Sequence, residues 1–259
     1  MNNVVIAIIL TALAGLSTSI GGLVAFFSKK TNKKFLAFTL GISGGVMIYV
    51  SFMELMSKAL GVLGSAYGAK LGTTYAVIWF FLGMTISALI DRLIPETPPL
   101  SDADPKKNKS SLMRTGIVTA LALGIHNFPE GMATFVSALK SPTMAIPIVI
   151  AIAIHNIPEG IAVAVPVYFA TGSKMKGFLY SFVSGMAEPV GAIAGYLLLM
   201  PFISYTLNAY VFAAVAGVMV FISVDELLPS AWADNHTHLA VYGFALGMAV
   251  MAVSLIGFM

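Results

Sequence analysis

The chain has 259 residues, 58% of them hydrophobic and 10% charged, and its mean hydropathy is +0.93. Soluble domains carry about 25% charged residues, so this composition excludes a soluble globular protein and predicts an integral membrane protein. Cysteine is absent, which excludes disulfides, thiolate zinc sites and iron–sulfur clusters. The net charge of +3 comes from basic residues in short segments between apolar runs, so it predicts membrane orientation and no nucleic-acid partner.

Apolar runs long enough to cross a bilayer follow one another along the whole chain. A helix needs about 20 apolar residues to span the hydrocarbon core. The sequence therefore predicts an all-α integral membrane protein, with eight transmembrane helices in a single transmembrane domain, residues 1–259. The eight predicted spans are about 4–27, 35–57, 71–94, 116–139, 144–170, 177–200, 207–231 and 239–258.

Lysine and arginine are distributed unequally between the two sides of the predicted membrane. If the N-terminus lies outside, 11 of the 14 basic residues face the cytoplasm, and only Lys58, Lys70 and Lys140 lie outside. The positive-inside rule thus predicts both termini outside the cytoplasm. Residues 95–115, "PETPPLSDADPKKNKSSLMRT", are rich in proline, serine and charge, and they predict a mobile cytoplasmic loop between the third and fourth spans.

The fourth and fifth spans carry the same polar motif, "IHNFPEG" at 125–131 and "IHNIPEG" at 154–160. Because the spans are consecutive, they run in opposite directions, and each motif falls near the middle of its helix. Two antiparallel copies that meet at mid-depth indicate a symmetry axis in the membrane plane, as in many transporters.

The spacing within the motif places a histidine and a glutamate on one face of each helix, because residues i and i+4 of a helix share a face. Each asparagine lies about 100° around the helix from its histidine. Each proline lacks an amide hydrogen, and the carbonyl oxygen four residues earlier loses its hydrogen bond. In hydrocarbon, a neighbouring helix or a cavity must satisfy this free carbonyl. The motif thus predicts six converging donors: His126, Asn127, Glu130, His155, Asn156 and Glu159.

Imidazole and carboxylate donors suit borderline divalent cations such as zinc, iron, cobalt and nickel. A site that also offers amide oxygens and water can bind manganese or cadmium. An ionised side chain at mid-membrane costs about 2.5–3.5 kcal/mol on insertion scales, so metal and carboxylates stabilise each other. In the sixth span, "GMAEPVG" supplies Glu188 as a third acid. If Glu130 and Glu159 bridge two ions, Glu188 and the two asparagines can hold the second cation. The sequence thus predicts a second cation about 3.5–4 Å from the first.

The second and seventh spans carry further acids. The segments "FMELMSKA" (52–59) and "VDELLPSA" (224–231) resemble each other, and an inverted arrangement of three, two and three helices relates them. Glu54 falls near the outer end of the second span, and Asp225 and Glu226 fall near the inner end of the seventh. Two interpretations stand side by side: these acids line an entrance and an exit for the ion, or they are interfacial groups that reach water.

The doubled HNxPEG motif, the eight spans and the "E-P-V-G" of the sixth span resemble the ZIP metal transporters (Zrt/Irt-like proteins), in particular their bacterial zinc-uptake type. The resemblance covers the whole chain. It implies a 3+2+3 helix arrangement, divalent-metal movement into the cytoplasm, an elevator-like motion and a homodimer. It also implies primary ligands His126, Glu130, His155 and Glu159, with Asn127, Asn156 and Glu188 at the adjacent second site. The chain departs from many relatives in residues 95–115, which contain no histidine.

The leading hypothesis is a divalent-metal uptake transporter in the cell inner membrane, with zinc first and iron, manganese, cobalt or cadmium as further substrates. Metal is expected as cargo, with no prosthetic group and no enzymatic activity. Two alternatives remain open. An intramembrane metalloenzyme would use a metal-bound water, but the chain lacks an H-E-x-x-H motif. A proton-coupled carrier of a small solute would use glutamate and histidine as proton relays.

Overall fold

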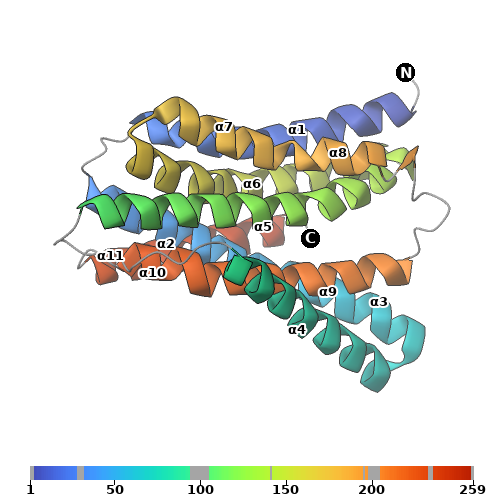
Figure 1. The fold of residues 1–259 in the computed structure, drawn as a ribbon. Helices are drawn as coiled ribbons and strands as arrows, with labels where there is room; N and C mark the ends of the chain where they lie inside the picture. The colour runs from blue at the N-terminus through green and yellow to red at the C-terminus, as the bar shows by residue number, and fades with distance from the viewer. Residues whose placement is uncertain are drawn as a thin grey trace.

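The computed structural model describes residues 3–27, 32–93, 105–140, 142–194, 196–197, 205–232 and 236–257, and the regular elements within these ranges are helical, as predicted. In chain order they are α1 (Asn3–Leu23), η1 (Val24–Phe27), α2 (Lys33–Val50), η2 (Ser51–Met56), α3 (Ser57–Tyr67), α4 (Ala69–Leu93), α5 (Pro105–Lys140), α6 (Pro142–Thr171), α7 (Lys174–Gly185), α8 (Ala187–Ala194), α9 (Tyr205–Ile222), η4 (Ser223–Leu227), α10 (Leu228–Trp232) and α11 (Thr237–Gly257). Figure 1 shows the longer helices running roughly parallel to one another, with α4 inclined to the rest.

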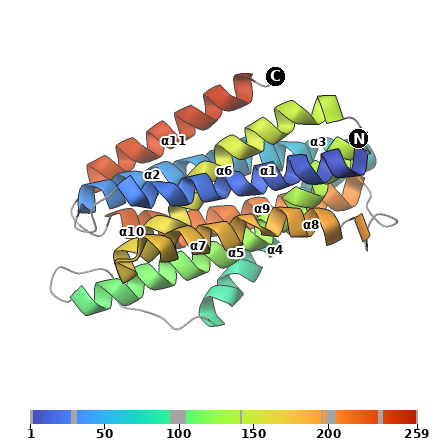
Figure 2. The same cartoon turned by 90° about the horizontal axis from the view of Figure 1, so that it is seen from above.

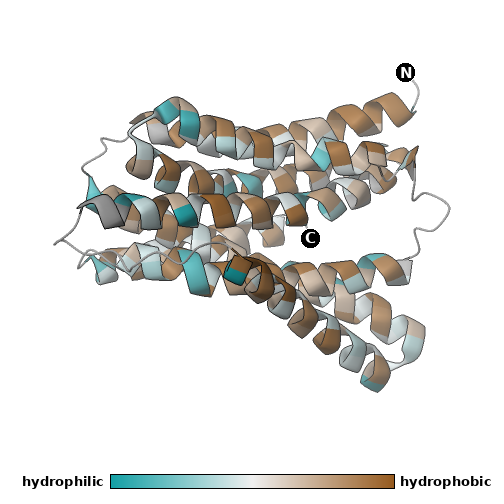
Figure 3. Ribbon diagram, in the orientation of Figure 1, coloured by the Kyte–Doolittle hydropathy of each residue, from teal (hydrophilic) through white to brown (hydrophobic). Residues whose placement is uncertain are grey.

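Six helices of the described part are long and apolar enough to cross a membrane, so the chain is a multi-pass membrane protein. The predicted spans 116–139 and 177–200 are not among these six. The first lies in α5, whose basic residues and polar motif lower its hydropathy. The second is divided at Met186, where α7 ends before α8 begins, so neither piece reaches the length of a span. Figure 3 shows the contrast with α4, which is hydrophobic along most of its length.

Two predicted boundaries are wrong. Helix α5 already begins at Pro105, so residues 105–115 are helical and do not form a loop. Proline favours the first helical turn because its missing amide hydrogen has no partner there in any case. The second rod continues through α3 to Tyr67, so Glu54 lies well inside a helix and not near its end. Residues 94–104, which include the rest of the predicted loop, are outside the described residues.

The helices pack as two groups. α1, α5, α6, α7 and α8 contact one another extensively and are called here the site bundle. α2, α3, α4, α9, α10 and α11, with η2 and η4, form the support bundle. The bundles meet along a seam where α2 packs on α6 and α9 packs on α5. Figure 1 shows the site bundle above the support bundle, and Figure 2 shows α11 next to α2 at the edge of the molecule.

Small residues bring helix backbones together within each bundle. On α1, the buried residues are small or short, such as Ala14, Gly15 and Thr18, whereas large apolar side chains such as Ile9 and Leu13 are exposed. This reversal of the soluble pattern is typical of membrane helices, where small residues allow close packing and large ones face lipid. Tight turns with positive φ at Gly68 (φ +83°) and Gly172 (φ +76°) connect neighbouring rods, a backbone conformation that glycine adopts without strain.

Candidate metal centre

The two motif histidines lie together inside the site bundle. α5 and α6 are separated only by residue 141, and they pack against each other as antiparallel neighbours. The ring centroids of His126 and His155 are 6.4 Å apart, and each residue is 1% exposed. The prediction that two oppositely directed helices bring their imidazoles to one place therefore agrees with the structure.

Glutamates of both motifs surround the two imidazoles. Glu130 lies between them, with one carboxylate oxygen 3.3 Å from Nε2 of His126 and the other 3.1 Å from Nε2 of His155. Glu159, on α6, places Oε1 3.6 Å from Nε2 of His126. His126, His155 and Glu159 can each offer one donor atom so that all three atoms lie within 4.8 Å of one another. Such a separation allows one ion to contact the three donors at once.

Many polar atoms of this cluster have no hydrogen bond although they are buried. They include Nδ1 of each motif histidine, both carboxylate oxygens of Glu159 and one oxygen of Glu188. A buried polar group left unsatisfied costs about 1–3 kcal/mol. Nitrogen and carboxylate donors crowded together in this way match the donor set of a borderline divalent cation.

The asparagines are held by backbone carbonyls of neighbouring helices. Asn156 donates its amide to the carbonyl oxygen of Ala14 on α1 at 3.0 Å and also to Oε1 of Glu188 on α8. Asn127 donates to the carbonyl oxygen of Ser184 on α7 at 3.4 Å. The Oδ1 atoms of both asparagines are buried and have no hydrogen bond. Each amide nitrogen is thus occupied, and each amide oxygen remains available as a donor to a cation.

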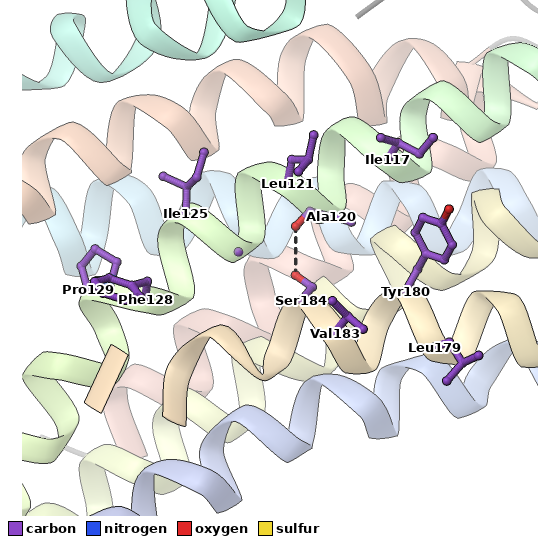
Figure 4. A pocket seen from close by; sticks show the side chains of 11 residues that line it. Ile117, Ala120, Leu121, Ile125, Phe128, Pro129, Leu179, Tyr180, Val183 and Ser184 are labelled. Atoms are coloured by element: carbon purple, nitrogen blue, oxygen red, sulfur yellow. Dashed lines mark hydrogen bonds between the residues drawn. The ribbon is translucent and has the colours of Figure 1, made fainter. Parts of the chain in front are cut away.

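The remaining motif positions serve packing. A Cβ added to Gly131 would meet the backbone of Glu188 on α8, and one added to Gly160 would meet the backbone of Thr18 on α1. Each motif glycine therefore lets its helix approach a neighbour closely. Other residues of the α5 motif are apolar: Figure 4 shows Ile125, Phe128 and Pro129 lining a groove against α7.

Comparison with known proteins identifies the family of the chain. The model of the ZIP zinc transporter family matches residues 96–255. A protein named zinc transporter ZupT from Clostridium perfringens is 54% identical, with 100% of this chain and 98% of the relative covered. The ZupT proteins of Streptococcus mutans (56% identical, 97% of each chain covered) and Chlorobaculum parvum (50%, 100% and 99% covered) are similar over the same extent. The chain belongs to the ZIP family.

A second acidic cluster of this ZIP protein lies at the seam. Asp91 of α4, Asp225 and Glu226 of η4 can each offer a carboxylate oxygen within 4.8 Å of the others. Arg114 of α5 forms ion pairs with Asp91 and Glu226, and Thr115 donates to Glu226 at 3.0 Å. The sequence indicated Asp225 and Glu226 but not Asp91 or Arg114. Arg114 belongs to the segment 95–115, which was predicted to be a loop. Its position directly before an apolar run is the only sequence feature that could have placed it near the acidic cluster.

Glu54, on η2, also lies in the support bundle. It is 9% exposed, and its Oε1 accepts a hydrogen bond from Nζ of Lys58 at 2.8 Å, while its Oε2 is buried without a partner. Between the bundles, Ser43 of α2 donates to the carbonyl oxygen of Pro158 at 2.7 Å. The support bundle thus contacts the α6 motif of the ZIP fold directly. No sequence pattern predicts this contact between residues 115 positions apart.

Proposed function

We propose that the chain is a divalent-metal uptake transporter and that zinc is its first substrate. The observation that carries the proposal is the single buried cluster in which two oppositely directed helices place His126, His155, Glu130 and Glu159 around one point. Relatives at 50–56% identity over nearly the whole chain are named zinc transporters, which supports the same substrate. Iron, manganese, cobalt and cadmium fit the same donors and are proposed as further substrates.

We propose the four residues named above as the primary ligands. Glu130 and Glu159 also bridge to a second ion, for which Glu188, Asn127 and Asn156 supply the other donors. The unpaired oxygens of Glu188 and of both asparagines support this second position. Three carboxylates offset most of the charge of two divalent ions, which lowers the cost of holding them away from water.

The proposed architecture has eight spans in a 3+2+3 inverted arrangement, in the cell inner membrane, with both termini outside the cytoplasm and a homodimer as the assembly. Metal enters near Glu54, binds at the central site and leaves past Asp225 and Glu226. The shared helical interruption at η2 and η4 supports the inverted relation between the second and seventh rods. The two bundles, which pack mainly within themselves, suit an elevator-like movement along the seam.

The decisive experiment is metal uptake into vesicles that contain the purified protein. We expect Zn²⁺ to accumulate above the level of empty vesicles and excess Zn²⁺ to inhibit uptake of Cd²⁺, Fe²⁺, Mn²⁺ and Co²⁺. Comparing vesicles with and without a pH gradient tests for proton coupling. Absence of uptake for every metal of this panel would refute the proposal.

Mild chelation separates transport from the metalloenzyme alternative. A transporter must release its ion, so we expect brief treatment with a chelator to remove the bound metal and added Zn²⁺ to restore it. A metalloenzyme keeps its ion through the reaction cycle, and metal that resists chelation would favour that alternative. Uptake of a labelled organic solute that Zn²⁺ does not inhibit would instead favour the small-solute carrier.

Replacing Asn156 by alanine tests the second ion. The variant loses the amide oxygen proposed as a ligand and the hydrogen bond to Glu188. We expect bound Cd²⁺, measured by elemental analysis of the purified protein, to fall from two ions per chain toward one. His238→Ala, on the exposed start of α11, serves as the control and is expected to keep the wild-type number. An unchanged number in Asn156→Ala would contradict the assignment.

A further inference from the structure

Two helical rods of the support bundle contain the same local feature. η2 (Ser51–Met56) interrupts the rod of α2 and α3, and η4 (Ser223–Leu227) interrupts the rod of α9 and α10, both as π-helical turns. Each turn begins with a serine that donates to the carbonyl oxygen four residues earlier, Ser51 to Met47 at 2.6 Å and Ser223 to Met219 at 2.7 Å. Single π-helical turns within α-helices often mark functional sites.

The two turns place a glutamate at the same position. Glu54 and Glu226 both stand three residues after the initial serine, and they are 9% and 4% exposed. η2 leads directly into α3 and η4 leads directly into α10, and these helices lie toward opposite ends of the support bundle (Figure 1). The two glutamates therefore stand on two rods of the support bundle, each just before the helix that leads toward one of these ends.

Each of these carboxylates has a basic partner from the chain itself. The ammonium of Lys58 lies 2.8 Å from Glu54, and the guanidinium of Arg114 pairs with Glu226 and Asp91. A buried carboxylate is unfavourable without a counter-ion. A dication that binds at Glu54 or Glu226 therefore competes with the basic group already present.

The two partners differ in how readily they can leave. The side chain of Lys58 is 50% exposed, and a lysine on its flexible stem can move its charge into water at little cost. Arg114 is 14% exposed and pairs with carboxylates on two different elements, which holds a guanidinium more firmly. The Oε2 of Glu54, buried and without a hydrogen bond, is a donor already available to an arriving ion.

We propose that Lys58 and Arg114 are exchangeable counter-ions of the two gate carboxylates, Glu54 and Glu226, and that the transported dication displaces them as it enters and leaves. The inference rests on the proposed transport function. In this proposal, Lys58 helps to set the apparent affinity for metal. Arg114 helps to hold the two bundles together at the seam when no metal occupies the acidic cluster.

Uptake kinetics of Lys58 variants test the proposal. We expect Lys58→Met to lower the KM for Zn²⁺ by about two- to fivefold, the size expected for loss of one partly exposed ion pair. Lys58→Arg retains the charge and should keep the wild-type KM. The effect should vanish in Glu54→Gln, because the carboxylate over which lysine and metal compete is then gone. Lys70→Met removes the same charge from an exposed position on α4 and should leave KM unchanged.

Three results would overturn the Lys58 assignment: an unchanged KM in Lys58→Met, an equal fall in Lys70→Met, or a fall that persists when Glu54 is glutamine. Wild-type uptake is measured in the same series. Absence of uptake by the wild type contradicts the transport function itself, whereas active wild type with an unaffected Lys58→Met contradicts only the counter-ion role.

Equilibrium binding tests Arg114 independently of transport. In protein whose central site is disabled by His126→Ala and His155→Ala, we expect Arg114→Met to bind Cd²⁺ at least about fivefold more tightly than Arg114→Lys, which keeps a cation beside the carboxylates. Size-exclusion chromatography shows whether each variant is folded. Equal affinity in the two folded variants would refute the role of Arg114, and if Arg114→Met does not fold, Arg114→Gln replaces it in the comparison.

Discussion

Uptake of Zn²⁺ is expected to fall to the level of empty vesicles in Glu159→Ala and in His126→Ala. Each change removes one of three donors that lie within 4.8 Å of one another. Glu159→Ala also removes a negative charge, so a dication at the site loses part of the compensation that makes burial tolerable. Uptake of radioactive or fluorescently detected Zn²⁺ into vesicles measures the effect directly.

Matched variants separate loss of the site from loss of the protein. Glu159→Gln keeps the volume of the side chain but not its charge, and it should also abolish uptake. His238→Ala removes a histidine from an exposed position and should retain wild-type uptake. All variants should be present in the membrane in normal amount. Wild-type uptake by Glu159→Ala or His126→Ala would contradict the assigned centre.

Replacing Gly160 by alanine is expected to destabilise the protein and to reduce uptake at least about tenfold. The new methyl group would meet the backbone of Thr18 on α1, which cannot move without separating two helices of the site bundle. Overpacking of this kind typically costs about 1–3 kcal/mol. Because Glu159 precedes Gly160 directly, separating α6 from α1 also displaces a central carboxylate. Thermal unfolding in detergent and vesicle uptake measure the two effects.

Gly124→Ala on α5 is the matched control. The same methyl group meets no atom within 4 Å there, because Gly124 lines the apolar groove beside α7. Alanine is favoured over glycine in a helix by about 0.8–1.0 kcal/mol, so this variant should be as stable as wild type or slightly more stable. Equal stability of Gly160→Ala and Gly124→Ala would show that the close approach of α6 and α1 is unimportant.

Much of the fold and of the candidate site could be predicted from the local sequence pattern. Apolar runs of about 20 residues predicted the helices, because the width of the bilayer and the rise of a helix determine that length. The spacing of His126 and Glu130, repeated at His155 and Glu159, predicted one buried donor set, because the helical period alone places i and i+4 on one face. Boundaries were less certain, and α5 starts at Pro105, well before the apolar run at 116.

The sequence by itself determined that the chain spans a membrane many times and carries a doubled set of metal-compatible donors. Only the tertiary structure decided that Glu130 stands between both imidazoles, that Asn156 is held by Ala14 and Glu188, and that Arg114 pairs with Asp91 and Glu226. Composition and period specify which face of a helix is polar. They do not specify how helices distant in sequence rotate and slide against each other, and these rotations bring particular atoms within hydrogen-bonding distance.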